Sequence, residues 1–551
     1  MSIKKIAEKV GVSPATVFRV LNNPNYRCAT PGLRDNSTED ITDHAIDFIF
    51  QHTNSFPDKP FFLYLAYGAV HAPHHAPKKY MDKYKGKFDE GWDEIRKKLF
   101  ANQKKLGIIP ESAELTESAP FVEAWDDLDE KRKKLYARYM EVFAGTLEYT
   151  DAQIGRFIEY LNSIEQLDNT LIVLLSDNGA SAEGGREGRV NRYTGINITE
   201  LDNEAEYGFE HIEELGGEYS FCQYPTGWAN ALNTPFQWYK TWTHEGGVKD
   251  PLILRYPKLI KDQNGVRNQY VHVSDVTPTV LDILGLKKPD FIKGVANHAF
   301  TDDYRKDIWE LYHVDEDYSE KYDVSEQYPE KLKELQEEFF IEAGRNNVFP
   351  LLLGSIHADP YKHKSFFGDI PIPESERVFK NIFKPYTLTE RPGVNIDNAS
   401  HFISVDIRRK GKEEGVLFSA GDHFGGFVFY IKDNKLKYAY NANRINYYTA
   451  ETEELPRGEI NVRFDFDYHG KAGGDVVLSV NGKEAAKVHI GRICFQRGDE
   501  SAFIRANFYT EVVPNYEVPF EFTGDILKLT IHTFPSKLSQ KDELEKAKAA
   551  E

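Results

Sequence analysis

Cysteine is scarce in this sequence: only Cys28, Cys222 and Cys494 occur among 551 residues, and none belongs to a Cys-x-x-Cys pair. This count excludes a disulfide scaffold and disfavours a structural zinc site. It fits a reducing compartment, although a cysteine-poor periplasmic protein has the same composition. The sequence also lacks an apolar run near the ~18 residues of a membrane span, and its N-terminus lacks an export signal. We therefore expect a cytoplasmic protein with no membrane partner.

Basic residues are outnumbered, with 68 Lys and Arg against 87 Asp and Glu, so the net charge is −19. Such an acidic chain is a poor nucleic-acid or membrane binder over its whole surface. Hydrophobic residues make up 40% of the chain and aromatic residues 13%, which excludes global disorder. The length predicts two to four domains.

Residues 1–27 differ from the rest because they carry five basic residues and one acidic residue. The segment IKKIAEKVGVSPATVFRVLNNP resembles the helix-turn-helix of the lac-repressor family. That resemblance implies that the second helix enters the major groove, with phosphate contacts from Ser13 and Thr16 and base contacts from Pro14, Ala15 and Arg19. The alternative is a small helical hairpin that binds nothing. Any DNA binding is expected to be weak, because one head offers few phosphate contacts and the body is acidic.

From residue 38 the pattern alternates between helices and strands. A helix is expected up to Pro57, an apolar strand at 61–65, and a long amphipathic helix that includes residues 139–161. The apolar run 170–175 suits a central parallel strand, and a further helix should begin at Ser274 or Asp275 and stop at Gly285. This alternation predicts an α/β sandwich.

Three polar clusters follow these elements. Ser176-Asp177-Asn178-Gly179 comes directly after the apolar run, where open α/β sheets bind ligands. A carboxylate beside an amide oxygen suits a hard cation such as calcium, although Asp-Asn-Gly is also an ordinary turn. His71 ends the 61–65 region, and Lys240 precedes a glycine-rich turn.

Several segments together resemble arylsulfatases of the alkaline phosphatase superfamily over residues 38–350: KPFFLYLAYGAVHAPHHAP, LDNTLIVLLSDNGASAEGG, NTPFQWYKTWTHEGGVKDPLILRYPK, HVSDVTPTVLDILG and IWELYHVDEDYSEKYDVSEQYPEKLKELQ. The resemblance implies a sulfate ester substrate and calcium ligation by Asp177 and Asn178. It also implies that His71 contacts the sulfate and assists the leaving group, while Lys240 binds a sulfate oxygen. His74, His75 and His244 have no clear family counterpart, and we expect supporting or surface roles for them.

The same resemblance exposes two departures from the family. No apolar strand ending in paired aspartates precedes residue 60, and the formylglycine motif Cys/Ser-x-Pro-x-Arg is absent. The run from Cys28 to Arg34 comes nearest but has extra residues before Pro31 and before Arg34. We therefore expect a sulfatase that lacks its N-terminal portion, with an incomplete calcium site and severely impaired activity. Cys28 is a nucleophile only if its irregular spacing is tolerated.

The last third of the chain has a period of two, which predicts a β-sandwich over 370–535 followed by a charged tail at 536–551. Tight hairpins are expected at Asp433-Asn434 and Asn481-Gly482. SHFISVDI, GVLFSAGDHFGGFVFYIKDNKLKYAYN and VPFEFTGDILKLTI resemble the concanavalin-like accessory domain of some large arylsulfatases. Its role is either carbohydrate binding or a structural cap.

The sequence thus predicts an incomplete, alkaline-phosphatase-like α/β core, preceded by a helix-turn-helix and followed by an all-β sandwich. The leading function is hydrolysis of sulfate esters. A phosphodiester or phosphonate hydrolase on the same scaffold is the enzymatic alternative. A DNA-binding regulator with a degenerate sulfatase body, or an inactive binding protein, is the alternative outside enzymes.

Overall fold

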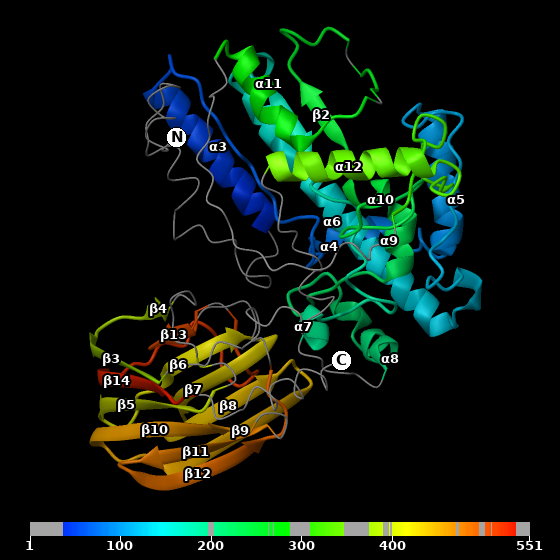
Figure 1. Ribbon diagram of the computed structural model, residues 1–551. Helices are drawn as coiled ribbons and strands as arrows, with labels where there is room; N and C mark the ends of the chain where they lie inside the picture. The colour runs from blue at the N-terminus through cyan, green and yellow to red at the C-terminus, as the bar shows by residue number, and fades with distance from the viewer. Residues whose placement is uncertain are drawn as a thin grey trace.

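The computed structural model describes most of the chain in two halves. The described residues are 37–196, 203–286 without 263 and 268, 309–346, 374–388, 396, 399–469, 473–494 and 502–535 without 509. Figure 1 shows a helical half, residues 37–346, above a β-rich half, residues 375–533. The predicted helix-turn-helix with its five DNA-contacting residues, Cys28 and the charged tail all lie outside the described residues.

The helical half is built around the long helix α6 (Glu130–Ser163), which confirms the predicted amphipathic helix. Asp129 caps this helix by accepting a hydrogen bond from the Arg132 backbone N–H. Its buried stripe includes Tyr139 and Val142, whereas Leu147, expected on the same stripe, is 50% exposed. Trp228 is fully buried against α6 and donates from its indole N–H to the Tyr136 carbonyl at 2.7 Å.

Shorter helices surround α6, and two of them confirm the sequence predictions. α3 (Ser37–Ser55) ends before Pro57, and α11 (Val276–Ile283) ends before Gly285. The others are α4 (Lys78–Met81), α5 (Gly91–Lys105), α7 (Arg192–Ile196), α8 (Glu204–Glu210), α9 (Thr226–Leu232), α10 (Glu245–Val248) and α12 (Pro329–Arg345). None of the helices in the described part of the chain is both long and apolar enough to cross a membrane.

The sheet of the helical half differs from the expected parallel arrangement. β1 (Ile172–Leu175) pairs antiparallel with β2 (Leu252–Arg255), so the prediction of a central parallel strand is wrong. Residues 61–65, expected to be a strand, form none. Within the described residues β1 and β2 pair only with each other, so 61–65 has no ladder partner. Phe62 and Tyr64 are accordingly 72% and 68% exposed.

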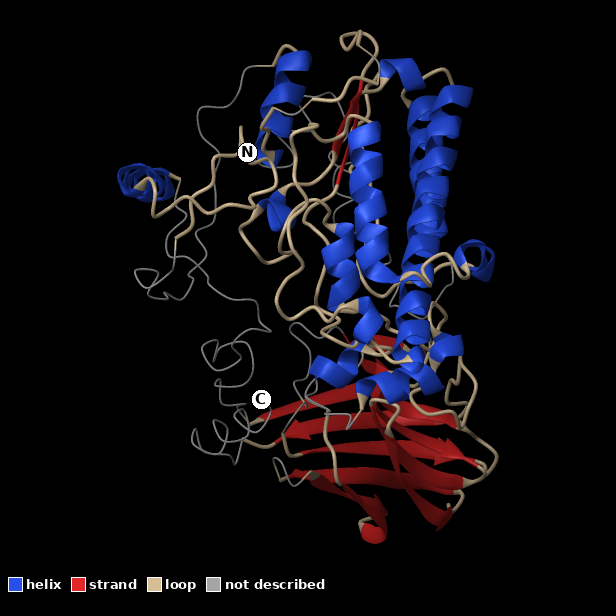
Figure 2. Cartoon of the chain, turned by 90° about the vertical axis from the view of Figure 1, so that its right-hand side faces the viewer, coloured by secondary structure: helices blue, strands red, loops and turns tan. Residues whose placement is uncertain are grey.

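The β-rich half, called the β-sandwich below, contains two six-stranded antiparallel sheets packed face to face (Figure 2). One sheet has the order β12-β11-β10-β5-β14-β3 and the other β4-β13-β6-β7-β8-β9. The strands are β3 (Ser375–Ile382), β4 (Tyr386–Leu388), β5 (His401–Arg409), β6 (Gly415–Asp422), β7 (Gly425–Lys432), β8 (Lys435–Ala442), β9 (Asn446–Glu454), β10 (Gly458–Tyr468), β11 (Gly474–Val480), β12 (Lys483–Ile490), β13 (Ala502–Ile504) and β14 (Asp525–Thr533).

Local sequence signals in the β-sandwich are confirmed. The β7–β8 and β11–β12 hairpins turn at Asp433-Asn434 and Asn481-Gly482, and all four residues have positive φ. Two adjacent positive φ angles are what a tight hairpin turn of the I′ type requires. Along β10, alternate residues are buried, as the period of two predicts.

The two halves meet at an aromatic contact. Phe424, in the β6–β7 turn, is 1% exposed and packs against Tyr193 and Phe221 of the helical half, with ring centroids 5.8 Å apart in both pairs. Arg444 adds an ion pair with Glu214, with nitrogen and oxygen 3.0 Å apart. This contact joins one turn of the β-sandwich to the end of the helical half that carries α7 and α8 (Figure 1).

We predict that Phe424→Ala removes the aromatic contact and lowers the unfolding free energy of the helical half. All six tryptophans lie at or before residue 309, so tryptophan fluorescence reports only the helical half. Removing a buried Phe costs about 3–5 kcal/mol, so the fluorescence-detected midpoint in guanidinium chloride should fall. Phe383→Ala, at a position 81% exposed, is the control and should change little. Equal midpoints for Phe424→Ala and the native protein would show that the two halves do not stabilise each other.

Candidate active site

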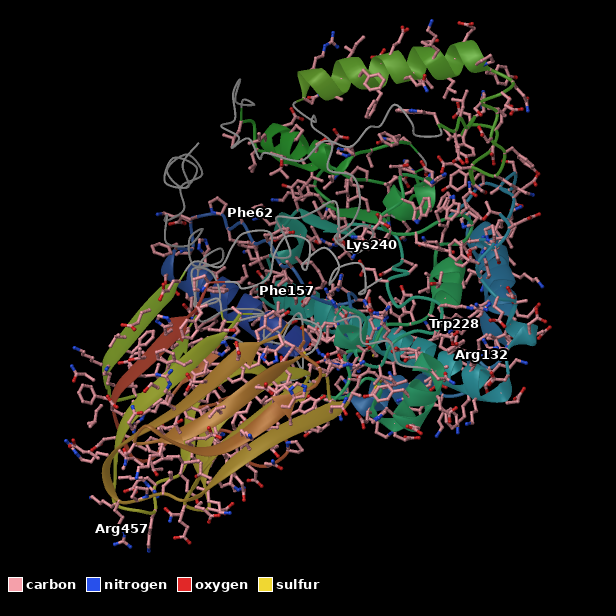
Figure 3. The ribbon with its side chains drawn as sticks, turned by 60° about the horizontal axis from the view of Figure 1, so that its bottom comes forward. Phe62, Arg132, Phe157, Trp228, Lys240 and Arg457 are labelled. Carbon is pink, nitrogen blue, oxygen red and sulfur yellow. The ribbon has the colours of Figure 1, made fainter. Side chains whose placement is uncertain are left out.

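Lys240 and His71 lie in direct contact although 169 residues separate them. The Lys240 Nζ is 3.2 Å from the His71 Nε2 and 3.5 Å from a carboxylate oxygen of Glu183. Both side chains reach solvent, because His71 is exposed and the Lys240 side chain is 20% exposed. Figure 3 shows Lys240 within the helical half, away from Arg457 at the far end of the β-sandwich.

The backbone around Lys240 is strained. Trp238 and Thr241 have φ of 63° and 80°, a region that β-branched and bulky residues rarely adopt. Such conformations persist where the surrounding structure enforces them, and they concentrate at functional sites. The Lys240 backbone N–H donates to the Ala180 carbonyl at 3.0 Å. Residues 238–241, called the lysine loop below, are therefore fixed against the loop that follows β1.

His71 is positioned by the two histidines that follow it. His74 is 4% exposed and stacks on Tyr224 at 5.2 Å, and burial lowers the pKa of His74 to about 3, helped by the neighbouring His75 and His71. His75 donates from Nε2 to the Ser220 carbonyl at 2.6 Å. Both histidines thus anchor the His71 segment to residues 220–224. His74 is a core residue, in agreement with the expected supporting role.

The loop after β1 is held by Asn233. The Asn233 side-chain oxygen accepts from the Ala180 N–H at 2.8 Å, and its nitrogen donates to the carbonyls of Trp238 and Gly246 at 2.7 and 2.6 Å. One buried amide therefore connects three segments: the loop after β1, the lysine loop and the glycine-rich turn at Gly246-Gly247. A Cβ on Gly179 would lie 1.9 Å from the Gly246 oxygen, so only glycine permits this approach.

Asp177 and Asn178 follow the end of β1, and the carboxylate of Asp250, which precedes β2, lies near that of Asp177. Leu175 pairs with Leu252, and the Ser176 N–H donates to the Pro251 carbonyl, so the next residues opposite each other are Asp177 and Asp250. Burial, together with the charge of Asp177, raises the pKa of Asp250 to about 6. Within the described residues neither carboxylate has a cationic partner.

These oxygens match the chemistry that calcium prefers but do not complete its shell. Calcium takes about six to eight oxygen ligands, and the set here is two carboxylates and one amide. The described residues include no group of three or more His, Cys, Asp and Glu side chains able to hold a metal. The donor types fit a hard cation, and water or residues outside the described ranges would have to supply the remaining ligands.

Asp250 and Asn233 were not predicted from the sequence. Asp250 could have been found only from the β1–β2 register, because nothing near it in sequence resembles a metal motif. Asn233 acts through its side-chain hydrogen bonds, which no local pattern reveals. His244, expected to support the site, donates to Glu310 at 2.6 Å, and its side chain is 13% exposed.

Comparison with known proteins identifies the family. The sulfatase family model matches residues 12–286. An uncharacterized sulfatase of Schizosaccharomyces pombe is 30% identical over 394 residues, which are 59% of this chain and 69% of the yeast protein. The chain belongs to the sulfatase family. An arylsulfatase of Klebsiella aerogenes is 30% identical over 42% of this chain and 47% of its own length.

This sulfatase spans about two thirds of the yeast relative and about half of the Klebsiella relative. Among solved structures, Ps i-CgsB in complex with k-i-k-neocarrahexaose aligns over 55% of this chain and 53% of its own, with 20% identity and a TM-score of 0.32. The family match begins at residue 12, inside the segment that resembles a helix-turn-helix. The comparisons support neither that head nor the loss of an N-terminal portion.

We predict that Asn233→Asp disrupts the site without removing any proposed ligand. Aspartate cannot donate to the carbonyls of Trp238 and Gly246, and each buried carbonyl left unpaired costs roughly 1–3 kcal/mol. The fluorescence-detected melting temperature should fall, together with the affinity for sulfate. Asn169→Asp is the control, because Asn169 is exposed and its oxygen accepts from Lys258. Unchanged stability of Asn233→Asp would show that the three loops are held by other contacts.

Proposed function

We propose that this sulfatase binds sulfate esters at Lys240 and His71 and belongs to the arylsulfatase type. The observation that carries the proposal is the 3.2 Å contact between the Lys240 ammonium and the His71 ring, beside the loop that follows β1. A fixed ammonium offsets the negative charge of a transferring sulfuryl group, and it does so without reorganisation during the reaction. The names of the Klebsiella relative and of one further matched protein, an arylsulfatase of Clostridium perfringens, support the same type.

The hydrogen bonds of His71 define its proton positions. Its Nδ1 lies 2.8 Å from the Ala72 carbonyl, which can only accept, so Nδ1 carries a hydrogen. Its Nε2 faces the Lys240 ammonium, which can only donate, so Nε2 offers its lone pair. His71 can therefore give a proton to a leaving oxygen only after taking one at Nε2. Solvent can supply that proton because His71 is exposed, while Lys240 keeps its charge, so the pair together can bind the ester and protonate the departing alcohol.

A divalent cation would be held by Asp177 and Asn178, as the family resemblance implies, with Asp250 opposite. When bound, it supplies positive charge that offsets the charge on the sulfate oxygens. The family's formylglycine nucleophile would come from Cys28 only if the irregular spacing of its motif is tolerated, and Cys28 lies outside the described residues. The expectation of severely impaired turnover rests on the missing paired aspartates and on the missing formylglycine motif, and it stays a prediction. The helix-turn-helix, its DNA binding and the concanavalin-like assignment also stay predictions.

Sulfate-ester binding is tested by calorimetry with methyl sulfate. We expect Lys240→Ala to weaken binding at least about tenfold, since a hydrogen bond to a charged group contributes ~1.5–3 kcal/mol. Lys97→Ala is the matched control, because Lys97 lies on α5 with a side chain 64% exposed. Binding of methyl phosphate and hydrolysis of 4-nitrophenyl sulfate serve as further readouts. Native affinity in Lys240→Ala would refute the site, and tighter binding of methyl phosphate would favour the phosphoryl alternative.

Calcium should stabilise the folded protein through this carboxylate pair. A ligand that binds only the native state raises its stability, so added calcium should raise the melting temperature. We expect Asp250→Asn and Asp177→Asn each to weaken calcium binding at least about tenfold, because calcium affinity depends on the number of charged ligands. Asp58→Asn, at an exposed position, is the control. A normal calcium response in Asp250→Asn, with a lost response in Asp177→Asn, would remove Asp250 from the metal site.

A further inference from the structure

Two turns of the β-sandwich contact one short segment of the helical half, residues 219–221. In the β8–β9 turn, the Arg444 guanidinium donates to the Tyr219 carbonyl and lies over the Tyr219 ring, 5.1 Å from its centroid. In the β6–β7 turn, Phe424 packs on the Phe221 ring. Both ends of the segment are therefore held by the β-sandwich.

The middle residue of this segment holds the chain that carries His71. Ser220 is fully buried, and its carbonyl accepts a hydrogen bond from the Nε2 of His75 at 2.6 Å. Just beyond the segment, the Cys222 Sγ donates to the His74 carbonyl at 3.4 Å. A displacement of residues 219–221 would therefore move His75, which follows His71 by four residues.

A second connection reaches His71 through its neighbour Ala72. Tyr193, Phe221 and Phe424 form one buried hydrophobic cluster, and Ala72 packs against it. The Ala72 carbonyl accepts a hydrogen bond from the Nδ1 of His71 at 2.8 Å. The cluster, to which the β-sandwich contributes Phe424, therefore supports the peptide group whose carbonyl orients the His71 ring.

Both turns are themselves fixed by buried amides of the β-sandwich. The Asn443 side chain donates to the Phe424 carbonyl at 3.1 Å, and the Asn441 side-chain oxygen accepts from the Arg444 N–H at 2.7 Å. Asn441 and Asn443 are both fully buried. Buried polar groups that are hydrogen-bonded rigidify their surroundings. Phe424 and Arg444 thus present a fixed surface to the helical half.

The lysine loop is held by residues of the helical half. The Lys240 N–H donates to the Ala180 carbonyl, and the Asn233 side chain donates to the same loop. The 3.2 Å contact between Lys240 and His71 therefore joins two groups with different supports. Asn233 fixes the lysine, whereas the histidine depends on the segment that the β-sandwich holds.

We propose that Arg444 and Phe424 are positioning residues of the sulfate site, so that the β-sandwich is a part of this site and not an independent module. The inference rests on the proposed function, because it assigns both residues to the orientation of His71 for contact with the sulfate ester. Neither residue touches the ester. They act through residues 219–221 and through the packing of Ala72.

The test follows the His71 ring by NMR in the full chain, with ¹³C-labelled histidine and with His71→Gln to assign its resonance. Arg444→Ala is the test variant, because it removes hydrogen bonds at the contact and leaves the aromatic cluster intact. We expect it to shift the His71 ring resonance in the absence of ligand. By calorimetry it should weaken methyl sulfate binding about 3- to 10-fold, the range that the loss of one hydrogen bond produces.

Two further variants show that these effects come from the contact. Arg444→Lys keeps a cation able to donate to Tyr219 and Glu214, so it should return the resonance and the affinity toward native values. Arg408→Ala is the matched control and should behave as native, because Arg408 pairs with Glu459 on the neighbouring strand. Melting temperatures show that each variant is folded under the conditions of measurement.

A native His71 resonance in Arg444→Ala would overturn the inference and would show that the contact only joins the two halves. Native methyl sulfate affinity in Arg444→Ala, with lowered affinity in Lys240→Ala, would also overturn it. Failure of the proposed function gives a different result, namely native methyl sulfate affinity in Lys240→Ala itself. The resonance is measured without ligand, so it reports the position of the His71 ring whether or not sulfate binds there.

Discussion

The candidate site depends on the side-chain amide of Asn233. A single buried group accepts from one loop and donates to two others, so it fixes the positions of the Ala180, Trp238 and Gly246 backbones together. An amide is suited to this because it combines an acceptor and two donors in one plane. The loop after β1 carries Asp177 and Asn178, and the lysine loop carries Lys240. Their mutual distance is therefore set by a residue that touches neither metal nor substrate in our proposal.

The same packing explains the glycines of the site. Side chains on Gly179, Gly246 or Gly247 would each lie within 2.1 Å of a backbone oxygen. Backbones that approach this closely leave no room for a Cβ, and they exchange hydrogen bonds directly, as between the Gly179 N–H and the Gly247 carbonyl. Rigidity of this kind matters for an anion site. Binding groups that are already oriented need no free energy for reorientation when the anion binds.

Local sequence patterns predicted most of the helices and hairpins, but they could not predict contacts between residues far apart in the sequence. The hairpins at Asp433-Asn434 and Asn481-Gly482 and the helices α3, α6 and α11 follow from turn chemistry and periodicity. The strand partner of β1 could not be predicted, because an apolar run of four to six residues is compatible with parallel or antiparallel neighbours. His71 and Lys240 were singled out by their places beside an apolar run and a glycine-rich turn, and only their roles came from the resemblance. Asp250 required the β1–β2 register, which no local signal contains.

In our proposal, the charges around the site would couple a bound metal to the sulfate ester. The Glu183 carboxylate lies 3.5 Å from the Lys240 ammonium, and the charge of Asp177 acts on the neighbouring Asp250. On a chain with a net charge of −19, such a surface repels a sulfate ester. A divalent cation between Asp177 and Asp250 would cancel their charge and remove this repulsion. By linkage, bound sulfate would then strengthen metal binding by the same factor by which metal strengthens sulfate binding. In our proposal, a bound metal would therefore be a condition for substrate binding as well as a source of charge stabilisation.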